Sequence, residues 1–246
     1  MTTYTLHYWP ILARNMCAVL VAKEAGLSRA FRKALCFYVP SPARARKGLA
    51  FTFPPRRRAS LTLPPHRLPA VTQNEPAWPA FKAQTLFGQL PHLESSDGLQ
   101  VSQSAAIVRV LARRGGLSGA SEADFAASEM LLEEYADLLN ALGKAMYGGA
   151  LAERPARFAA FLGAEGGARK HLEHFEKLAQ AGGSFTSTVT SGECAVACAL
   201  HTLLGLKADV AEGLPKLAAF WAARKARTAE ALAGLAPYYT PDSKEE

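Results

Sequence analysis

The sequence predicts an α/β domain over residues 1–114, followed by an all-α domain over residues 121–246. Three observations support this division. The segment 4–9, "YTLHYW", alternates in the manner of a short strand. The segments 12–27 and 102–115 carry apolar residues at helical spacing. After a glycine-rich linker, only helical patterns occur.

The two predicted segments "PHLE" (91–94) and "LQV" (99–101) complete the α/β part as a hairpin. Asp97-Gly98 between them is a turn signal. The segment 190–206 is apolar almost all round, which predicts a central buried helix. Helices are predicted at 12–27, 102–115, 122–146, 154–180, 190–206 and 214–235, with a polar tail at 237–246.

Composition excludes several classes of protein. The chain has 246 residues, of which 49% are hydrophobic, so it can bury a sizeable core. No apolar run approaches the ~20 residues of a membrane span, and "MTTYTLHYWP" has no signal-peptide pattern, so we expect a cytoplasmic protein without membrane partners. The cysteines fit neither a disulfide framework nor zinc spacing, so no metal is expected, and Cys194 and Cys198 predict a buried pair on one helix face.

The net charge of +7 belongs to one segment. Residues 32–73 contain nine basic residues and no acidic one, whereas 19 basic and 21 acidic residues remain elsewhere. The rest of the chain is therefore mildly acidic. Such a distribution does not favour a nucleic-acid partner for the folded part.

The same segment, 32–73, interrupts the predicted pattern. It holds seven of the fifteen prolines and has no sustained period, which predicts a loop outside the working fold. Two interpretations stay open, namely translated intron sequence and a disordered surface excursion. The flank 31–39, with apolar Leu35, Phe37 and Val39, is a candidate for the missing second strand.

The order β–α–β–β–α, with a proline opening the hairpin, is similar to the thioredoxin-like pattern. With a helical domain appended, the chain resembles the cytosolic glutathione S-transferases over about 1–31 and 74–235. The motif "WPAFKAQTLFGQLPHLE", followed by "QSAAIVRVLAR", carries the likeness, and "TLHYWPILAR" resembles the start of the sigma class. The resemblance implies a glutathione transferase fold, a cis proline at Pro91, glutathione as cosubstrate and a homodimer.

The resemblance also implies the residues of a glutathione site. Tyr8 and Arg14 would be catalytic, with the Tyr8 hydroxyl donating to the thiolate and so lowering the thiol pKa. Lys82 would meet the glycyl carboxylate, and the opening of helix 102–115 would bind the γ-glutamyl carboxylate. The implied glutathione-binding residues are Tyr8, Trp78, Lys82, Gln89, Leu90, Pro91, Gln103, Ser104 and, from the partner subunit, Asp137.

Each of these residues also has a structural interpretation, such as a core aromatic for Tyr8 or a helix N-cap for Gln103 and Ser104. Three functions remain: transfer of glutathione to a hydrophobic electrophile in detoxification, a glutathione-dependent isomerase of the prostaglandin D synthase type, and a non-catalytic transferase-like binding protein. Retention of Tyr8 argues against the third.

Some features depart from the family or fall outside its site. The family's Arg-Gly before the catalytic arginine is Leu12-Ala13 here. Thr190 and Glu193 form a capping-box pattern in which Gly192 is expected to weaken the helix start. His171 and His174 lack the spacing of a zinc protease and are interpreted as a solvated helix face.

Overall fold

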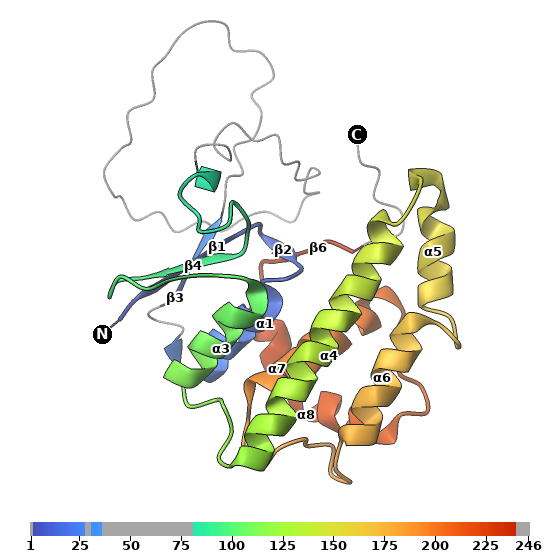
Figure 1. Ribbon diagram of the computed structural model, residues 1–246. Coiled ribbons are helices and arrows are strands. Elements are labelled where there is room, and N and C mark those ends of the chain that lie inside the picture. Colours follow the sequence, from blue (N-terminus) through green and yellow to red (C-terminus); the bar gives the residue numbers. More distant parts are fainter. Residues whose placement is uncertain (1, 28–30, 36–80, 240–246) are drawn as a thin grey trace, which may run out of the picture.

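A computed structural model describes residues 2–27, 31–35 and 81–239, and the elements keep the labels of Figure 1. The predicted site residue Trp78 and most of the segment 32–73 lie outside the described residues. The strands are β1 (Tyr4–Tyr8), β2 (Ile11–Leu12), β3 (Phe31–Leu35), β4 (His92–Ser95), β5 (Gln100–Ser102) and β6 (Ala236–Pro237).

Each predicted helical segment contains helix, but the helix expected from residue 12 begins only at Met16, because Leu12 lies in β2. The helices are α1 (Met16–Glu24), α3 (Ser104–Arg114), α4 (Glu122–Tyr147), α5 (Arg154–Phe161), α6 (Gly167–Leu178), α7 (Ser191–Leu206), α8 (Pro215–Leu232) and a short 3-10 helix, η2 (Leu151–Glu153). Among the described residues, no helix is both long enough and apolar enough to cross a bilayer.

Four strands form the main sheet in the order β3-β1-β4-β5. β1 runs parallel to β3 and antiparallel to β4, and β4 pairs with β5 through the predicted hairpin. Residues 31–35 thus supply the expected second strand, which corrects the start of the predicted insert. Figure 1 shows α1 and α3 together below this sheet, where they pack against each other.

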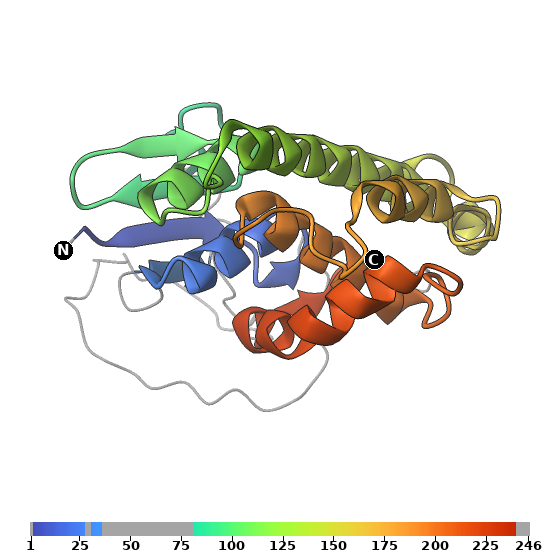
Figure 2. The same ribbon diagram turned by 90° about the horizontal axis from the view of Figure 1, so that it is seen from below.

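The helical part is built around α7. Helices α1, α4 and α8 all pack against it, so it joins the sheet-bearing half to the long helix α4. Figures 1 and 2 show α4 running the length of the molecule with α5 and α6 beside it. Residues Ser191 to Leu200 are all buried, which confirms the predicted central helix and the burial of Cys194 and Cys198.

The start of α7 shows why Gly192 stands there. A Cβ at Gly192 would lie 2.5 Å from the carbonyl oxygen of Ser128 on α4, so only glycine permits this approach of the two helices. The Ser128 hydroxyl accepts from the Gly192 N–H at 2.9 Å, and the Thr190 hydroxyl caps the helix by accepting from the Glu193 N–H. The intrinsic cost of glycine in a helix is therefore offset by closer packing.

Two predicted boundaries are wrong. The segment 154–180 is not one helix but two, α5 and α6, because the chain turns through Gly163 to Gly166 and leaves no room for a side chain at Gly166. The tail predicted at 237–246 is not polar at its start. There β6 pairs in parallel with β2, and Tyr239 is buried; residues 240–246 lie outside the described part.

Glu193 is the charged group on which the start of α7 depends, and its replacement should be costly. Its side chain is only 2% exposed, and it accepts from the N–H groups of Phe185 and Thr186 and pairs with Arg224 at 2.6 Å. Glu193→Ala should lower the free energy of unfolding in urea by about 3 kcal/mol, because three partners lose their acceptor.

The exposed pair of Glu173 with Arg169 provides the matched control, and Glu173→Ala should change stability by no more than about 0.5 kcal/mol. Equal effects of the two substitutions would contradict a structural role for the buried carboxylate of Glu193.

Candidate functional site

A pocket of about 580 Å³ lies where β1 ends and the hairpin strand β4 begins. Eight of the residues predicted for the site line it together, although they come from three separate stretches of the chain. The lining residues are Tyr8, Trp9, Ile11, Arg14, Lys82, Gly88, Gln89, Leu90, Pro91, Gln103, Ser104 and Tyr238.

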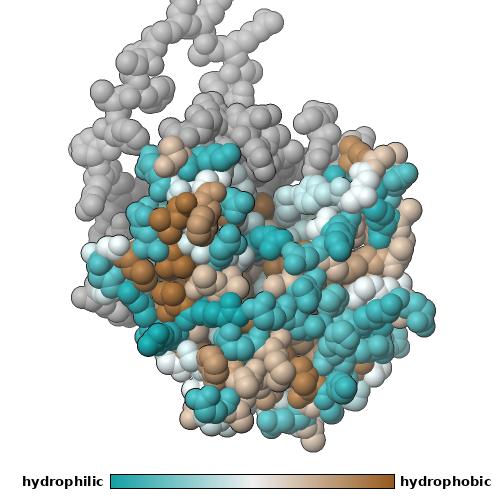
Figure 3. Space-filling view, viewed as in Figure 1, coloured by the Kyte–Doolittle hydropathy of each residue, from teal (hydrophilic) through white to brown (hydrophobic). Residues whose placement is uncertain are grey.

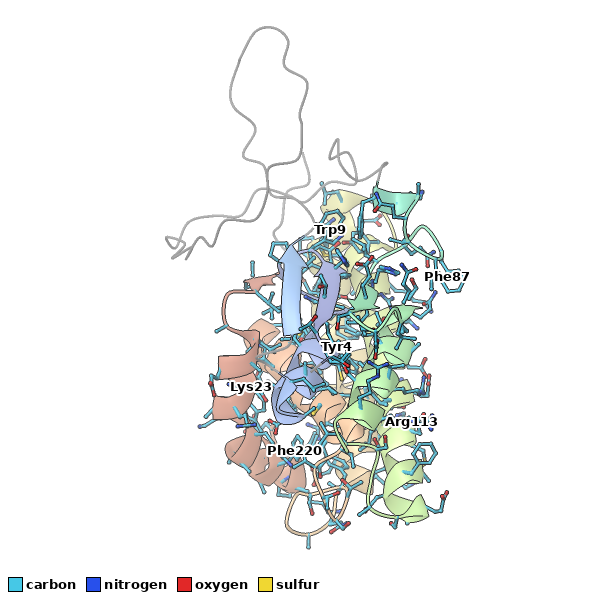
Figure 4. All side chains as sticks on the ribbon, turned by 90° about the vertical axis from the view of Figure 1, so that its left-hand side faces the viewer. Tyr4, Trp9, Lys23, Phe87, Arg113 and Phe220 are labelled. Atoms are coloured by element: carbon cyan, nitrogen blue, oxygen red, sulfur yellow. The ribbon has the colours of Figure 1, made fainter. Side chains whose placement is uncertain are left out.

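The turn from β1 to α1 carries Tyr8 and Arg14 into the pocket. Figure 4 shows Tyr4 at one end of β1 and Trp9 just beyond the other end. Asn15, which is 3% exposed, braces this turn: its Nδ2 donates to the Trp9 carbonyl at 3.5 Å, and its Oδ1 accepts from the Ala13 N–H at 3.4 Å. The turn is therefore held by a buried side chain that does not line the pocket.

Burial governs the acidity of the Tyr8 phenol. Loss of hydration raises its pKa well above the ordinary value, and the neighbouring Tyr239 raises it further. The backbone N–H of Arg14, which donates to the phenolic oxygen, and the Arg14 guanidinium act in the opposite direction. Tyr8 therefore remains protonated at neutral pH and can act as a hydrogen-bond donor.

The segment between Lys82 and Pro91 forms a second wall. The Leu90–Pro91 peptide bond is cis, as expected from the resemblance. Gly88 has φ +63°, and a Cβ there would lie 3.1 Å from Lys82 Cε, so the lysine stem runs close over this glycine. Leu90 and Lys82 thus line the same pocket.

The third wall is the N-terminus of α3. Gln103 precedes the helix with φ 76°, and it is the one non-glycine residue with positive φ in the part of the chain that the structure describes. Its Nε2 donates to Gln89 Oε1 at 3.5 Å, which joins the second and third walls. The first N–H groups of a helix have no partners within it, so this end suits a carboxylate.

Asp137 does not line the pocket of its own chain. It is exposed on α4, one turn before Asn140, whose Oδ1 accepts from Arg14 Nη2 at 2.9 Å. This position is compatible with the expectation that Asp137 serves a partner's site.

Sequence reasoning missed Trp9, Ile11, Gly88, Asn15 and Tyr238. Tyr238 was hidden because it falls in the segment interpreted as a polar tail. The pairing of β6 with β2, supported by a bond from the Ala236 N–H to the Pro10 carbonyl at 2.9 Å, brings it to the pocket. The paired aromatic residues at 238 and 239 were the available signal, since such residues rarely stay in solvent together.

Comparison with known sequences gives short matches. No protein-family model matches the chain. It is 44% identical over 63 residues to a Caenorhabditis elegans protein named probable glutathione S-transferase 6, covering 26% of this chain and 30% of that one. The match to glutathione S-transferase 1 of Ascaris suum is 44% over 62 residues, covering 25% and 30%. The match thus spans about 30% of the length of these relatives.

Comparison with solved structures covers nearly the whole chain. A sigma-class glutathione transferase of Fasciola hepatica superposes with a TM-score of 0.68 at 18% identity, covering 98% of this chain and 99% of that one. A prostaglandin synthase D of Nilaparvata lugens gives 0.64 at 17% identity, covering 95% and 94%. The chain therefore has the glutathione transferase fold, and about a quarter of it is similar in sequence to proteins named glutathione S-transferase.

The backbone strain at Gln103 gives a stability test of the site. A non-glycine residue in this conformation costs on the order of 1–3 kcal/mol, whereas glycine adopts it freely at a smaller entropic cost. Gln103→Gly should therefore raise the free energy of unfolding by about 1 kcal/mol in a urea titration.

Gln103→Ala is the control, because alanine removes the same side chain but keeps the strained conformation. It should give no gain in stability. A glycine variant no more stable than the alanine variant would show that position 103 carries no strain.

Proposed function

We propose that this protein is a sigma-like glutathione transferase that adds the glutathione thiolate to small hydrophobic electrophiles. The observation that carries the proposal is the buried phenol of Tyr8, which stays protonated in a pocket with the cis-proline segment and the α3 N-terminus. Detoxification in the cytoplasm is part of the same proposal and comes from the family resemblance.

In this mechanism, Tyr8 activates the glutathione thiol. Only the thiolate is a good nucleophile, and a donor that bonds to the thiolate lowers the thiol pKa. The N–H of Arg14 bonds the phenolic oxygen, which leaves the phenolic hydrogen for the sulfur. The positive charge of Arg14 adds attraction for the developing anion, and Asn140 holds its guanidinium from α4.

The rest of the tripeptide would be held by complementary charge and backbone bonds. The Leu90 backbone next to the cis proline suits the cysteinyl part, and the Lys82 ammonium suits the glycyl carboxylate. Gln89, Gln103 and Ser104 lie where the γ-glutamyl carboxylate would meet the N-terminus of α3. Trp78, assigned to the glycyl end by resemblance, lies outside the described residues.

The electrophile would enter beside the aromatic side of the pocket, formed by Tyr8, Trp9 and Tyr238. The alternative activity, glutathione-dependent isomerisation of the prostaglandin D synthase type, is favoured by the likeness to the Nilaparvata lugens prostaglandin synthase D. A conjugation assay with an aromatic halide and an isomerisation assay with a prostaglandin endoperoxide separate the two. Glutathione binding without either activity would favour a binding protein.

A homodimer is part of the proposal, supported by exposed apolar side chains in the segment before Pro91 and on α4. Leu86 and Phe87 are 53% and 63% exposed in the segment before Pro91, and Figure 4 shows Phe87 pointing outward. Phe125 and Met130 are exposed on α4. Figure 3 shows hydrophobic residues gathered on the left of this face of the molecule, and association covers patches of this kind.

Replacement of Tyr8 tests the chemistry. Tyr8→Phe should lower kcat/KM for conjugation roughly 10–100-fold, because a hydrogen bond to a charged group contributes ~1.5–3 kcal/mol. Glutathione affinity should change little. Loss of the donor raises the pKa of the bound thiol, so the rate profile should shift to higher pH.

Tyr4→Phe, at the other end of β1, is the control and should leave the rate and its pH profile unchanged. Equal turnover by Tyr8→Phe and wild-type protein would mean that another group activates the thiol.

Asp137 allows a test of whether each subunit contributes a residue to its partner's glutathione site. Asp137→Asn should weaken glutathione binding in the homodimer, because a carboxylate partner of the ligand amine is lost. A mixed dimer of one Tyr8→Phe subunit and one Asp137→Asn subunit should recover roughly half of the wild-type activity. One of its two symmetric sites then keeps both groups.

The control is a mixed dimer of one wild-type subunit and one subunit that carries both Tyr8→Phe and Asp137→Asn. Each of its two sites lacks one of the two groups. Activity of the first mixed dimer no higher than this control would show that Asp137 does not reach the partner's site.

A further inference from the structure

Helices α4 and α6 bring a carboxylate and two imidazoles together outside the glutathione pocket. His171 and His174 lie three residues apart on α6, and Glu134 faces them from α4, against which α6 packs. Figures 1 and 2 both show these two helices side by side. The His171 side chain is 16% exposed and Glu134 is 20% exposed, so the interpretation of these histidines as a solvated face is wrong for His171.

The geometry of the three groups is convergent. Glu134 Oε1 lies 2.6 Å from His171 Nδ1 and 2.7 Å from His174 Nδ1, and all three ligand atoms lie within 4.8 Å of one another. Both rings therefore turn the same nitrogen toward one oxygen. The rings stand nearly perpendicular, at 81°, so they approach this point from different directions.

We propose that Glu134, His171 and His174 bind one divalent transition-metal ion of the zinc type. Two imidazole nitrogens and one carboxylate oxygen form a donor set that Zn²⁺ uses with a fourth, open position. The two histidines come from successive turns of one helix, and the carboxylate comes from the neighbouring helix. Such a site would tie α4 to α6 and leave its fourth position to water or a small ligand.

The distances fit the ion after a small adjustment. Ligand bonds of about 2.0–2.2 Å in a tetrahedron place neighbouring donor atoms about 3.3 Å apart. Each of the two nitrogen–oxygen separations must therefore lengthen by about 0.6 Å. His174 is 60% exposed, which gives its ring and the ion access from solvent. Metal binding through Nδ1 requires that atom to be free of a proton, and Nε2 of the same ring can carry the proton instead.

The surrounding structure holds the frame of this cluster. Leu172 and Phe175 of α6 are fully buried, and so is Leu138 of α4. These core residues fix the two helices that carry the cluster. None of the three ligands lines the glutathione pocket, so this site is independent of the proposed transferase activity. It is also distinct from the buried thiols of Cys17, Cys194 and Cys198, which lie in the α1 and α7 core.

Metal uptake by the full chain, without a histidine tag, tests the proposal. Equilibrium dialysis against Zn²⁺ should give one bound ion per chain, and Co²⁺ should give the visible absorption of a four-coordinate site. Zn²⁺ should also raise the melting temperature, because an ion that binds only the folded state stabilises it.

Three variants identify the ligands. Glu134→Gln keeps an oxygen that can accept hydrogen bonds from both rings but is a poor metal ligand. His174→Ala truncates the most exposed ligand, so its folding is not at risk, and His171→Ala removes the third. Each should weaken Zn²⁺ binding at least about tenfold and remove the Co²⁺ spectrum, since even outer partners of a metal site contribute 10–100-fold.

Two controls match these substitutions in chemistry. Glu173→Gln changes an exposed carboxylate on α6, and His201→Ala removes a histidine of α7, and both should bind as the wild-type chain does. Wild-type chain that takes up no ion, or Glu134→Gln and His174→Ala chains that bind Zn²⁺ like wild type, would overturn the proposal. The cluster would then be a hydrogen-bonded clamp between the two helices.

Discussion

The nearly complete burial of α7 is the constraint on which the rest of the structure depends. A helix that is apolar all round must be enclosed on every side, and here α1, α4 and α8 enclose it. The enclosure positions the site, because α1 carries the turn with Tyr8 and Arg14, and α4 carries Asn140, which holds Arg14. Glu193 makes the enclosure possible at the helix start by bonding N–H groups that burial would otherwise leave without an acceptor.

The pocket itself is formed by backbone features more than by side-chain packing. A cis bond before Pro91, a positive φ at Gly88 and a strained conformation at Gln103 shape two of its walls. The strained backbone of Gln103 is typical of a site in which function, and not stability, determines the conformation.

Local sequence patterns predicted most of the fold, and the family resemblance supplied eight of the residues that line the pocket. The alternation in 4–9, the helical spacing from 122 onward and the Gln-Leu-Pro motif each depend on neighbours in the chain, so they can be recognised without a structure. The features that were missed depend on contacts between distant segments. The contact of Gly192 with Ser128 and the pairing of β6 with β2 have no local pattern, and the latter hid Tyr238 within a tail interpreted as polar.

That last pairing links the C-terminal end of the described chain to the chemistry at Tyr8. Burial raises the pKa of Tyr239 to about 12, and the same residue contributes to the raised pKa of Tyr8. A phenol must keep its proton to donate a hydrogen bond to a thiolate, and burial together with the neighbouring Tyr239 holds Tyr8 in that protonated form. Arg14 works against this effect only through its own charge and one N–H bond. The two-residue strand β6 thus acts on the proposed catalytic group through the position of the tyrosines that follow it.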